Sequence, residues 1–190
     1  NGVEMEKAFV QWGGLVAERA QSVFDFFTGF DDPVYFAPSV SNRTTNLLAW
    51  TSTWGEGVTS SVSVEDPSFR RALAGSDTYA GTRIPDLVAN LRVDRQWGMM
   101  QAMAAYHQNL GEIQDPTRPG PWAADGWAIG AGVMVRLPEI GRGDKLWFQV
   151  ALARGAVDYT TPDPFWYVDF ADRSNTGVFQ RTDWAVTTEI

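Results

Sequence analysis

Acidic residues stand side by side at two places in the sequence, Asp31–Asp32 and Glu65–Asp66. Paired carboxyl groups hydrolyse glycosides when they face each other across a cleft, but neighbouring residues on a strand point to opposite faces. His107 is the single histidine and cysteine is absent, which excludes a multi-histidine metal site, a zinc–thiolate site and a thiol nucleophile. No nucleophile pattern accompanies His107. These residues predict neither an enzyme nor a cofactor.

Basic residues fall on the polar side of alternating segments. Arg92 and Arg136 are assigned to that side, with Arg19 and Lys7 as further candidates. Arg92 and Asp94 share a face and are expected to pair along it, which in solvent contributes only about 0–1 kcal/mol.

The elements that must position these charges are strands, because apolar and polar residues alternate with a period of two. In the stretch 87–94, Leu87, Ala89, Leu91 and Val93 lie on one face, and Asn90, Arg92 and Asp94 lie on the other. Several runs approach the 9–11 residues of a tilted strand that spans a bilayer. The pattern predicts about nine strands, at residues 5–12, 15–24, 46–54, 58–65, 86–96, 99–109, 127–137, 145–154 and 178–189.

The connections between these strands alternate between tight and long. Tight turns are expected near residues 13–14, 55–57, 97–98 and 138–144, and long connections near 26–45, 66–85, 111–126 and 155–177. Outer-membrane barrels have short turns at one end and long loops at the other. Trp12, Trp54 and Trp97 each precede a turn glycine, as in an aromatic girdle at headgroup level.

Composition narrows the class of protein further. The chain has 190 residues, of which 44% are hydrophobic and 13% aromatic, which excludes wholesale disorder. The net charge of -8 argues against a nucleic-acid partner. No apolar run approaches the roughly 18 residues that a spanning helix needs.

A soluble β-sandwich that binds carbohydrate through surface tryptophans is the alternative. In a sandwich the apolar side of each strand points inward, and periodicity alone does not separate it from a membrane barrel. The alternating connections and the tryptophans beside turns favour the barrel.

Several motifs resemble the alphaproteobacterial general porin family. The first is Arg19-Ala20-Gln21-Ser22 followed by Phe24-Asp25-Phe26, and the most specific is the stretch from Ile84 to Asp94. Val64-Glu65-Asp66-Pro67 and Gly143-Asp144-Lys145-Leu146-Trp147 also fit. One departure is Glu18, where the family prefers a small residue; an outward carboxylate would be costly in lipid.

The resemblance implies an all-β, antiparallel transmembrane barrel of the general-porin type in the outer membrane of a Gram-negative bacterium. Such porins are 16-stranded homotrimers that pass ions and small hydrophilic solutes by diffusion. By its length, residues 1–190 would form one partial barrel domain, with strands missing at both ends. The family also folds one long loop into the pore, which corresponds here to about residues 27–45.

An acidic loop facing a basic wall would create a transverse field across this constriction, and rings of charge set channel selectivity. Taken alone, Asp31-Asp32-Pro33 is typical of a solvated turn; the resemblance favours the constriction. The expected pore-lining residues are Lys7, Arg19, Asp31, Asp32, Arg43, Glu65, Arg92, Asp94 and Arg136.

Overall fold

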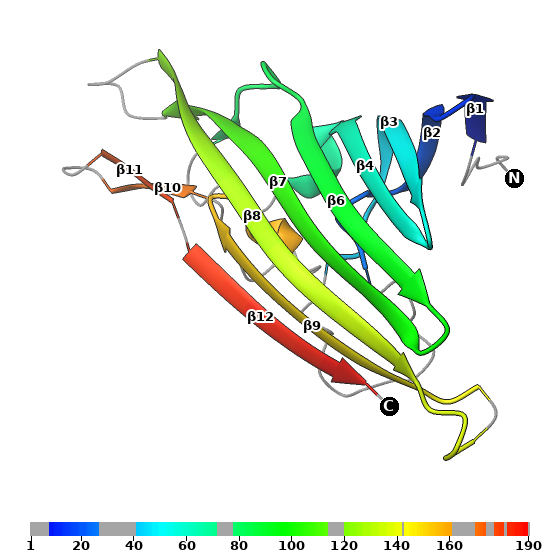
Figure 1. Ribbon diagram of the computed structural model, residues 1–190. Helices are drawn as coiled ribbons and strands as arrows, with labels where there is room; N and C mark the ends of the chain where they lie inside the picture. Colours follow the sequence, from blue (N-terminus) through cyan, green and yellow to red (C-terminus); the bar gives the residue numbers. More distant parts are fainter. Residues whose placement is uncertain are drawn as a thin grey trace, which may run out of the picture.

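The strands form one antiparallel sheet in which neighbours along the chain are neighbours in space (Figure 1). The computed structural model describes residues 8–26, 41–71, 78–113, 120–141, 143–160, 170–173, 177–180 and 182–189. The strand order is β1-β2-β3-β4-β6-β7-β8-β9-β12, with β5 paired to β7 and a separate β10–β11 hairpin. The strands β1 and β12 lie at opposite edges of this sheet.

In the described ranges nine strands follow this path, which confirms the predicted number of about nine. Their bounds are β1 Ala8–Trp12, β2 Leu15–Gln21, β3 Thr44–Gly55, β4 Val58–Glu65, β6 Asp86–Arg95, β7 Gly98–Ile113, β8 Gly120–Arg136, β9 Lys145–Arg154 and β12 Thr182–Glu189. The shorter strands are β5 Thr78–Tyr79, β10 Phe170–Arg173 and β11 Gly177–Gln180, and two 3-10 helices are η1 Pro67–Arg70 and η2 Val157–Tyr159.

The central hairpin is longer than predicted. Strands β7 and β8 have 16 and 17 residues, and their pairing runs as far as Ile113 opposite Gly120. Most of the connection expected at 111–126 is therefore part of the sheet. The predicted ninth strand at 178–189 is divided between β11 and β12.

The pairing register gives the sheet one largely apolar face and one mixed face that carries most of the charged side chains. One row of partners runs across it from Leu48 through Val64, Leu87 and Tyr106 to Trp127. Leu48 and Leu87 are 47% and 50% exposed, although both are large and apolar. We call this side the outer face and the opposite side the inner face; the exposure of the apolar side matches the alternation of a barrel wall.

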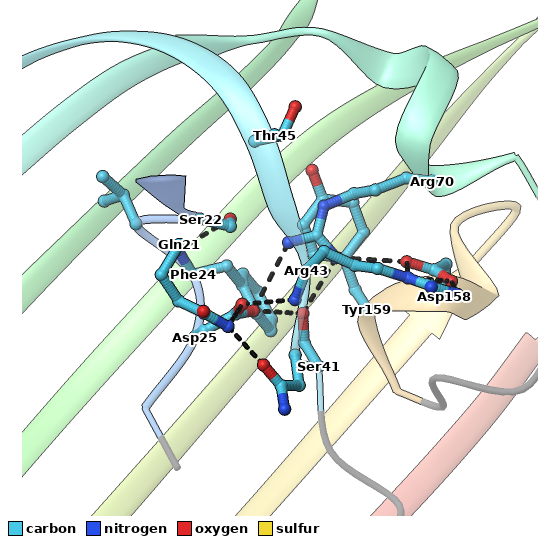
Figure 2. Close-up of polar contacts among 12 residues, drawn as sticks. Gln21, Ser22, Phe24, Asp25, Ser41, Arg43, Thr45, Arg70, Asp158 and Tyr159 are labelled. Atoms are coloured by element: carbon cyan, nitrogen blue, oxygen red, sulfur yellow. Dashed lines mark hydrogen bonds and ion pairs between the residues drawn. The ribbon is translucent and has the colours of Figure 1, made fainter. Parts of the chain in front are cut away.

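A small core lies on the inner face. Phe24 and Tyr159 are fully buried there, with Val88, Met103 and Ala128 beneath them. Phe24 and Phe26 come from the segment after β2, and Tyr159 comes from η2. The inner face is therefore covered by connecting segments of the same chain, which Figure 2 shows in close-up.

Tight turns occur on alternate connections, as predicted. At the β3–β4 turn Gly57 has φ +73°, and a Cβ there would lie 2.0 Å from the carbonyl oxygen of Asp94, so only glycine fits. Trp12, Trp54 and Trp97 lie beside these turns and are 83%, 71% and 45% exposed. Within the described residues, no helix is long and apolar enough to cross a membrane.

Candidate pore-lining site

The segment that follows β2 folds back onto the inner face. The backbone turns after Gln21, with the Asp25 amide donating to the carbonyl of Ser22 at 3.1 Å. The Phe24 amide donates to the Ser22 hydroxyl at 3.2 Å. Ser22 itself donates its amide to the carbonyl of Arg43 at 2.9 Å, which joins the two ends of the long β2–β3 connection.

Polar side chains of the inner wall hold this segment by its backbone. Glu65 of β4 accepts the Val23 amide at 3.0 Å, and Asn90 of β6 donates to the Val23 carbonyl at 2.8 Å. Gln101 of β7 donates to the Phe24 carbonyl at 3.4 Å. The neighbouring strands β4, β6 and β7 thus supply hydrogen-bond partners to backbone groups of Val23 and Phe24. Without these partners the backbone groups would be buried with their hydrogen bonds unmade.

Further along the wall, a glycine makes room for an aromatic ring. A Cβ at Gly132 of β8 would lie 2.2 Å from the Phe26 ring, so any larger residue would displace it. The Phe26 ring meets Trp147 of β9 edge to face, with ring centroids 5.2 Å apart. The segment 22–26 therefore crosses the inner face from β4 to β9.

Arg70 of η1 is the centre of a buried ionic network (Figure 2). Its guanidinium donates to the Ser41 hydroxyl at 2.8 Å and lies 3.3 Å from carboxylate oxygens of both Asp25 and Asp158. The same group lies 3.9 Å from the centre of the Tyr159 ring. Burial opposes its charge, but Tyr159 and the two carboxylates outweigh that effect and raise the pKa of Arg70.

Asp25 joins both ends of the β2–β3 connection to this network. Its carboxylate accepts the Arg43 amide at 2.7 Å and the Ser41 hydroxyl. Arg43 in turn binds Asp158 of η2 through Nε at 3.0 Å and through a second guanidinium nitrogen. Two arginines and two aspartates from four segments form a paired cluster, the arrangement in which buried charges are tolerated.

A second set of buried contacts connects η2 to the wall. The Tyr159 hydroxyl donates to Asp86 of β6 at 2.7 Å, and the other oxygen of this carboxylate lies 2.7 Å from His107 Nδ1 of β7. Burial raises the pKa of the Tyr159 hydroxyl well above its usual value. His107 thus has a structural partner, and the described residues contain no group of three side chains that could hold a metal ion.

The expected pore-lining residues fall into several environments. Lys7, Asp31 and Asp32 lie outside the described residues. Arg43 and Glu65 are on the inner side, where they fasten connecting segments. The remaining members of the set, Arg92, Asp94, Arg136 and Arg19, lie in strands.

The inner wall near the tight turns carries charge that the network does not use. Arg136 of β8 pairs with Asp94 at 3.2 Å across β7, so Asp94 pairs with this residue rather than with Arg92. Arg92 is half-buried on the inner face and has no partner among the residues that the structure describes. Within the described ranges, no carboxylate therefore neutralises Arg92 on this wall.

Arg19 does not lie on the inner face of the sheet. Its register partner is Asn46, two residues before exposed Leu48, so Arg19 lies on the outer face. Its guanidinium lies 4.9 Å from the centre of the Phe69 ring. By the same register Glu18 pairs with Leu47 on the inner face, which avoids a carboxylate in lipid.

Sequence reasoning missed Arg70, Asp158 and Tyr159, and it gave Asp25 no role beyond its motif. Asp25 and Asp158 lie 45 and 88 positions from Arg70 in the sequence, so no local spacing connects them. The one local signal is Asp66-Pro67: Asp66 caps η1 by accepting the Ser68 amide at 2.9 Å. That helix places Arg70 in the network.

Comparison with known proteins gives consistent results. A family model described as "Porin subfamily" matches residues 1–190. Porin Omp2b of Brucella suis and of Brucella abortus is 28% identical over 128 residues, which covers 59% of this chain and 32% of the relative.

The fold resembles the crystal structure of the outer membrane channel DcaP of Acinetobacter baumannii. The TM-score is 0.73 at 14% sequence identity, and the match covers 97% of this chain and 50% of that one. The chain thus spans about a third of the curated relatives' length and half of the channel's. Since the family model covers every residue, the chain belongs to the porin subfamily, whose members are not enzymes.

Proposed function

We propose that this chain forms part of the wall of a water-filled channel in the outer membrane of a Gram-negative bacterium. Ions and small hydrophilic solutes diffuse through the channel, and no cofactor or covalent step is needed. The outer face supports this proposal, because its exposed Leu87, Leu91 and Ile129 side chains suit lipid tails.

The observation that carries the proposal is the segment 22–26 on the inner face. A segment fastened across the wall narrows the lumen of a barrel that contains it. The expected constriction at about residues 27–45 begins directly after this segment, so Asp31 and Asp32 are proposed to face the lumen there. They would lie opposite Arg92 and Arg136 and create a transverse field.

Membership of the family also supports a homotrimer as the assembled form. The subunits would be embedded side by side in the bilayer, with hydrophilic solutes and ions as the transported partners. This part of the proposal depends on the family resemblance.

The carbohydrate-binding sandwich has less support. A sandwich covers its apolar face with a second sheet. In the described part of the chain, the apolar side of the large sheet is exposed, and the fold matches a membrane channel.

Cysteine substitution tests the proposal, because the chain has no cysteine of its own. The protein is inserted in planar bilayers, and a charged, water-soluble thiol reagent is added to Arg92→Cys or Leu91→Cys. We expect the reagent to reduce single-channel current in Arg92→Cys, whose position faces water. Leu91→Cys is the matched control, because Leu91 is the neighbour on the opposite face.

Channel current should persist in the control after the reagent is added. Equal modification of both variants, or a protein that conducts no current before labelling, would contradict the proposed wall. Equal modification would mean that both faces of the strand are in contact with water. Absence of current would mean that the protein forms no channel.

A further inference from the structure

The inner face between the segment 22–26 and the tight turns carries a polar patch over β3, β4 and β6. Four of its six side chains bear a hydroxyl group and one bears a positive charge. Directly opposed residues on paired strands have their Cβ atoms about 5 Å apart, so a solute at this patch meets the cation and several hydroxyls together. We call it the hydroxyl patch, and it consists of two adjacent rows of register partners, Thr53–Thr59–Arg92 and Thr51–Ser61–Asn90.

The cation of the hydroxyl patch is not used by the fold. Arg92 is half-buried, and among the described residues no hydrogen bond or ion pair reaches its guanidinium. The nearest carboxylate along β6 is Asp94, which pairs with Arg136 at 3.2 Å. A charge that is partly removed from water gains from a partner of opposite sign, so this position favours an anion beside Arg92.

The hydroxyl groups of the patch are available as well. Within the described ranges, Thr53 and Thr59 make no side-chain hydrogen bond to another protein group. In the same ranges Thr51 and Ser61 bond only to each other, at 2.8 Å. Each hydroxyl has one donor and two acceptor sites, so all four can exchange hydrogen bonds with a solute.

The docked segment closes the patch on the side of β7. Gln101, the register partner of Arg92 on β7, donates to the Phe24 carbonyl at 3.4 Å and is only 3% exposed. At the opposite end of the row Thr53 is exposed. The open part of the row, from Arg92 to Thr53, therefore measures two inter-strand steps, or about 10 Å.

We propose that the hydroxyl patch binds solutes that combine one carboxylate with several hydroxyl groups, as sugar acids do. Arg92 pairs with the carboxylate, since a guanidinium binds this group through two parallel hydrogen bonds. The hydroxyls of β3 and β4 bond those of the solute along the open part of the row, a distance that gluconate spans. A single arginine matches the single charge of a carboxylate, whereas a phosphate group carries about −1.5 to −2.

This inference rests on the proposed channel and names a class of solute for its wall. Arg92 then binds solute in addition to contributing to the transverse field. An inorganic anion would need only the arginine, and a neutral sugar would need only the hydroxyls. The hydroxyl patch favours neither, because it places the charge and the hydroxyls within one row.

Inhibition of single-channel current in planar bilayers tests the patch, with potassium chloride as the electrolyte and D-gluconate as the probe. Hexanoate has the carboxylate and the carbon chain without the hydroxyls, and D-glucose has hydroxyls without the charge. We expect gluconate to interrupt the current at the lowest concentration of the three. Arg92→Gln should raise the half-inhibiting concentration of gluconate at least about tenfold, because a charge-assisted hydrogen bond is lost.

The contribution of the hydroxyls is tested by Thr59→Val, which replaces one hydroxyl by a methyl group. This change should weaken inhibition by gluconate about threefold and leave inhibition by hexanoate unchanged. Ser60→Ala is its matched control, because Ser60 lies on the outer face of the same strand and accepts a hydrogen bond from Trp54 at 2.9 Å. Arg95→Gln is the control for the charge, because Arg95 pairs with Glu56.

Equal half-inhibiting concentrations for gluconate, hexanoate and glucose would overturn the hydroxyl patch. So would an Arg92→Gln variant that gluconate inhibits as strongly as the native protein. Each variant is compared with its own current in potassium chloride alone. A protein that conducts no current contradicts the channel and the patch with it, whereas a conducting protein without selective inhibition contradicts the patch and leaves the channel standing.

Discussion

Replacement of Arg70 by glutamine tests whether the buried network holds the inward-folded segment. The change removes the cation that lies 3.3 Å from both Asp25 and Asp158, together with a 2.8 Å hydrogen bond to Ser41. Asp158 keeps Arg43 as a partner, whereas Asp25 keeps only hydrogen bonds from neutral groups. A buried ion pair that loses one partner costs about 3–5 kcal/mol.

That free energy corresponds to a shift of about 150- to 5,000-fold in the equilibrium between docked and released segment. Hydrogen exchange measures it locally, because the Val23 and Arg43 amides donate to Glu65 and Asp25 in the docked state. We expect exchange of both amides to accelerate in Arg70→Gln. Single-channel conductance should rise and become noisier as the segment leaves the lumen.

The matched control is Arg95→Gln, because the Arg95–Glu56 pair has the same 3.3 Å separation but is exposed. We expect an effect of only about 0–1 kcal/mol there. If Arg70→Gln has the amide protection and conductance of the control, the network does not hold the segment. If Arg70→Gln does not fold, Arg70→Lys, which keeps the positive charge, replaces it in the experiment. We expect the amide protection and the conductance of Arg70→Lys to lie between those of Arg95→Gln and those expected for Arg70→Gln.

Two further predictions concern contacts of the same segment. Gly132→Val should raise conductance in planar bilayers, since its side chain would occupy the space of the Phe26 ring; unchanged conductance would show that this ring does not narrow the lumen. The raised pKa of Tyr159 stabilises the folded state fully below pH 10, the usual value for tyrosine, and this stabilisation is lost as pH rises toward the folded-state pKa. Denaturant unfolding between pH 8 and 12 should therefore show a larger alkaline loss of stability in the native protein than in Tyr159→Phe, and equal losses in both would refute this assignment.

Strand periodicity predicted most of the sheet because apolar and polar side chains alternate between the two faces of each strand. In β6 the alternation of Leu87, Leu91 and Arg92 is strong enough to show directly which side chains lie on the outer face and which lie on the inner face. In β2 the sequence Glu18-Arg19 places two charges on opposite faces, so composition does not decide which one points outward. The register with β3 decides it, and this pairing between distant segments is invisible in the sequence of β2 alone.

Two other features depend on contacts between segments. Residues 120–126 include Gly120, Pro121 and Asp125, which are typical of a loop, yet pairing with β7 makes them strand. The buried network joins Asp25 to Arg70 and Asp158 across connections whose folding no periodicity describes. Glu65 was recognised as an inner-face residue, but its bond to the Val23 amide follows only from the position of the docked segment.

The length of the β7–β8 hairpin has a consequence for the space above the membrane. Tyr106 and Trp127 are register partners, and aromatic side chains of this kind mark the headgroup level. From His107 to Ile113 strand β7 continues beyond that level, and β5 pairs with it at Glu112. At about 3.3 Å per residue and a tilt of about 45°, this part rises roughly 15 Å above the headgroups. In the proposed channel, a solute would therefore pass along a protein wall before it reaches the level of the bilayer.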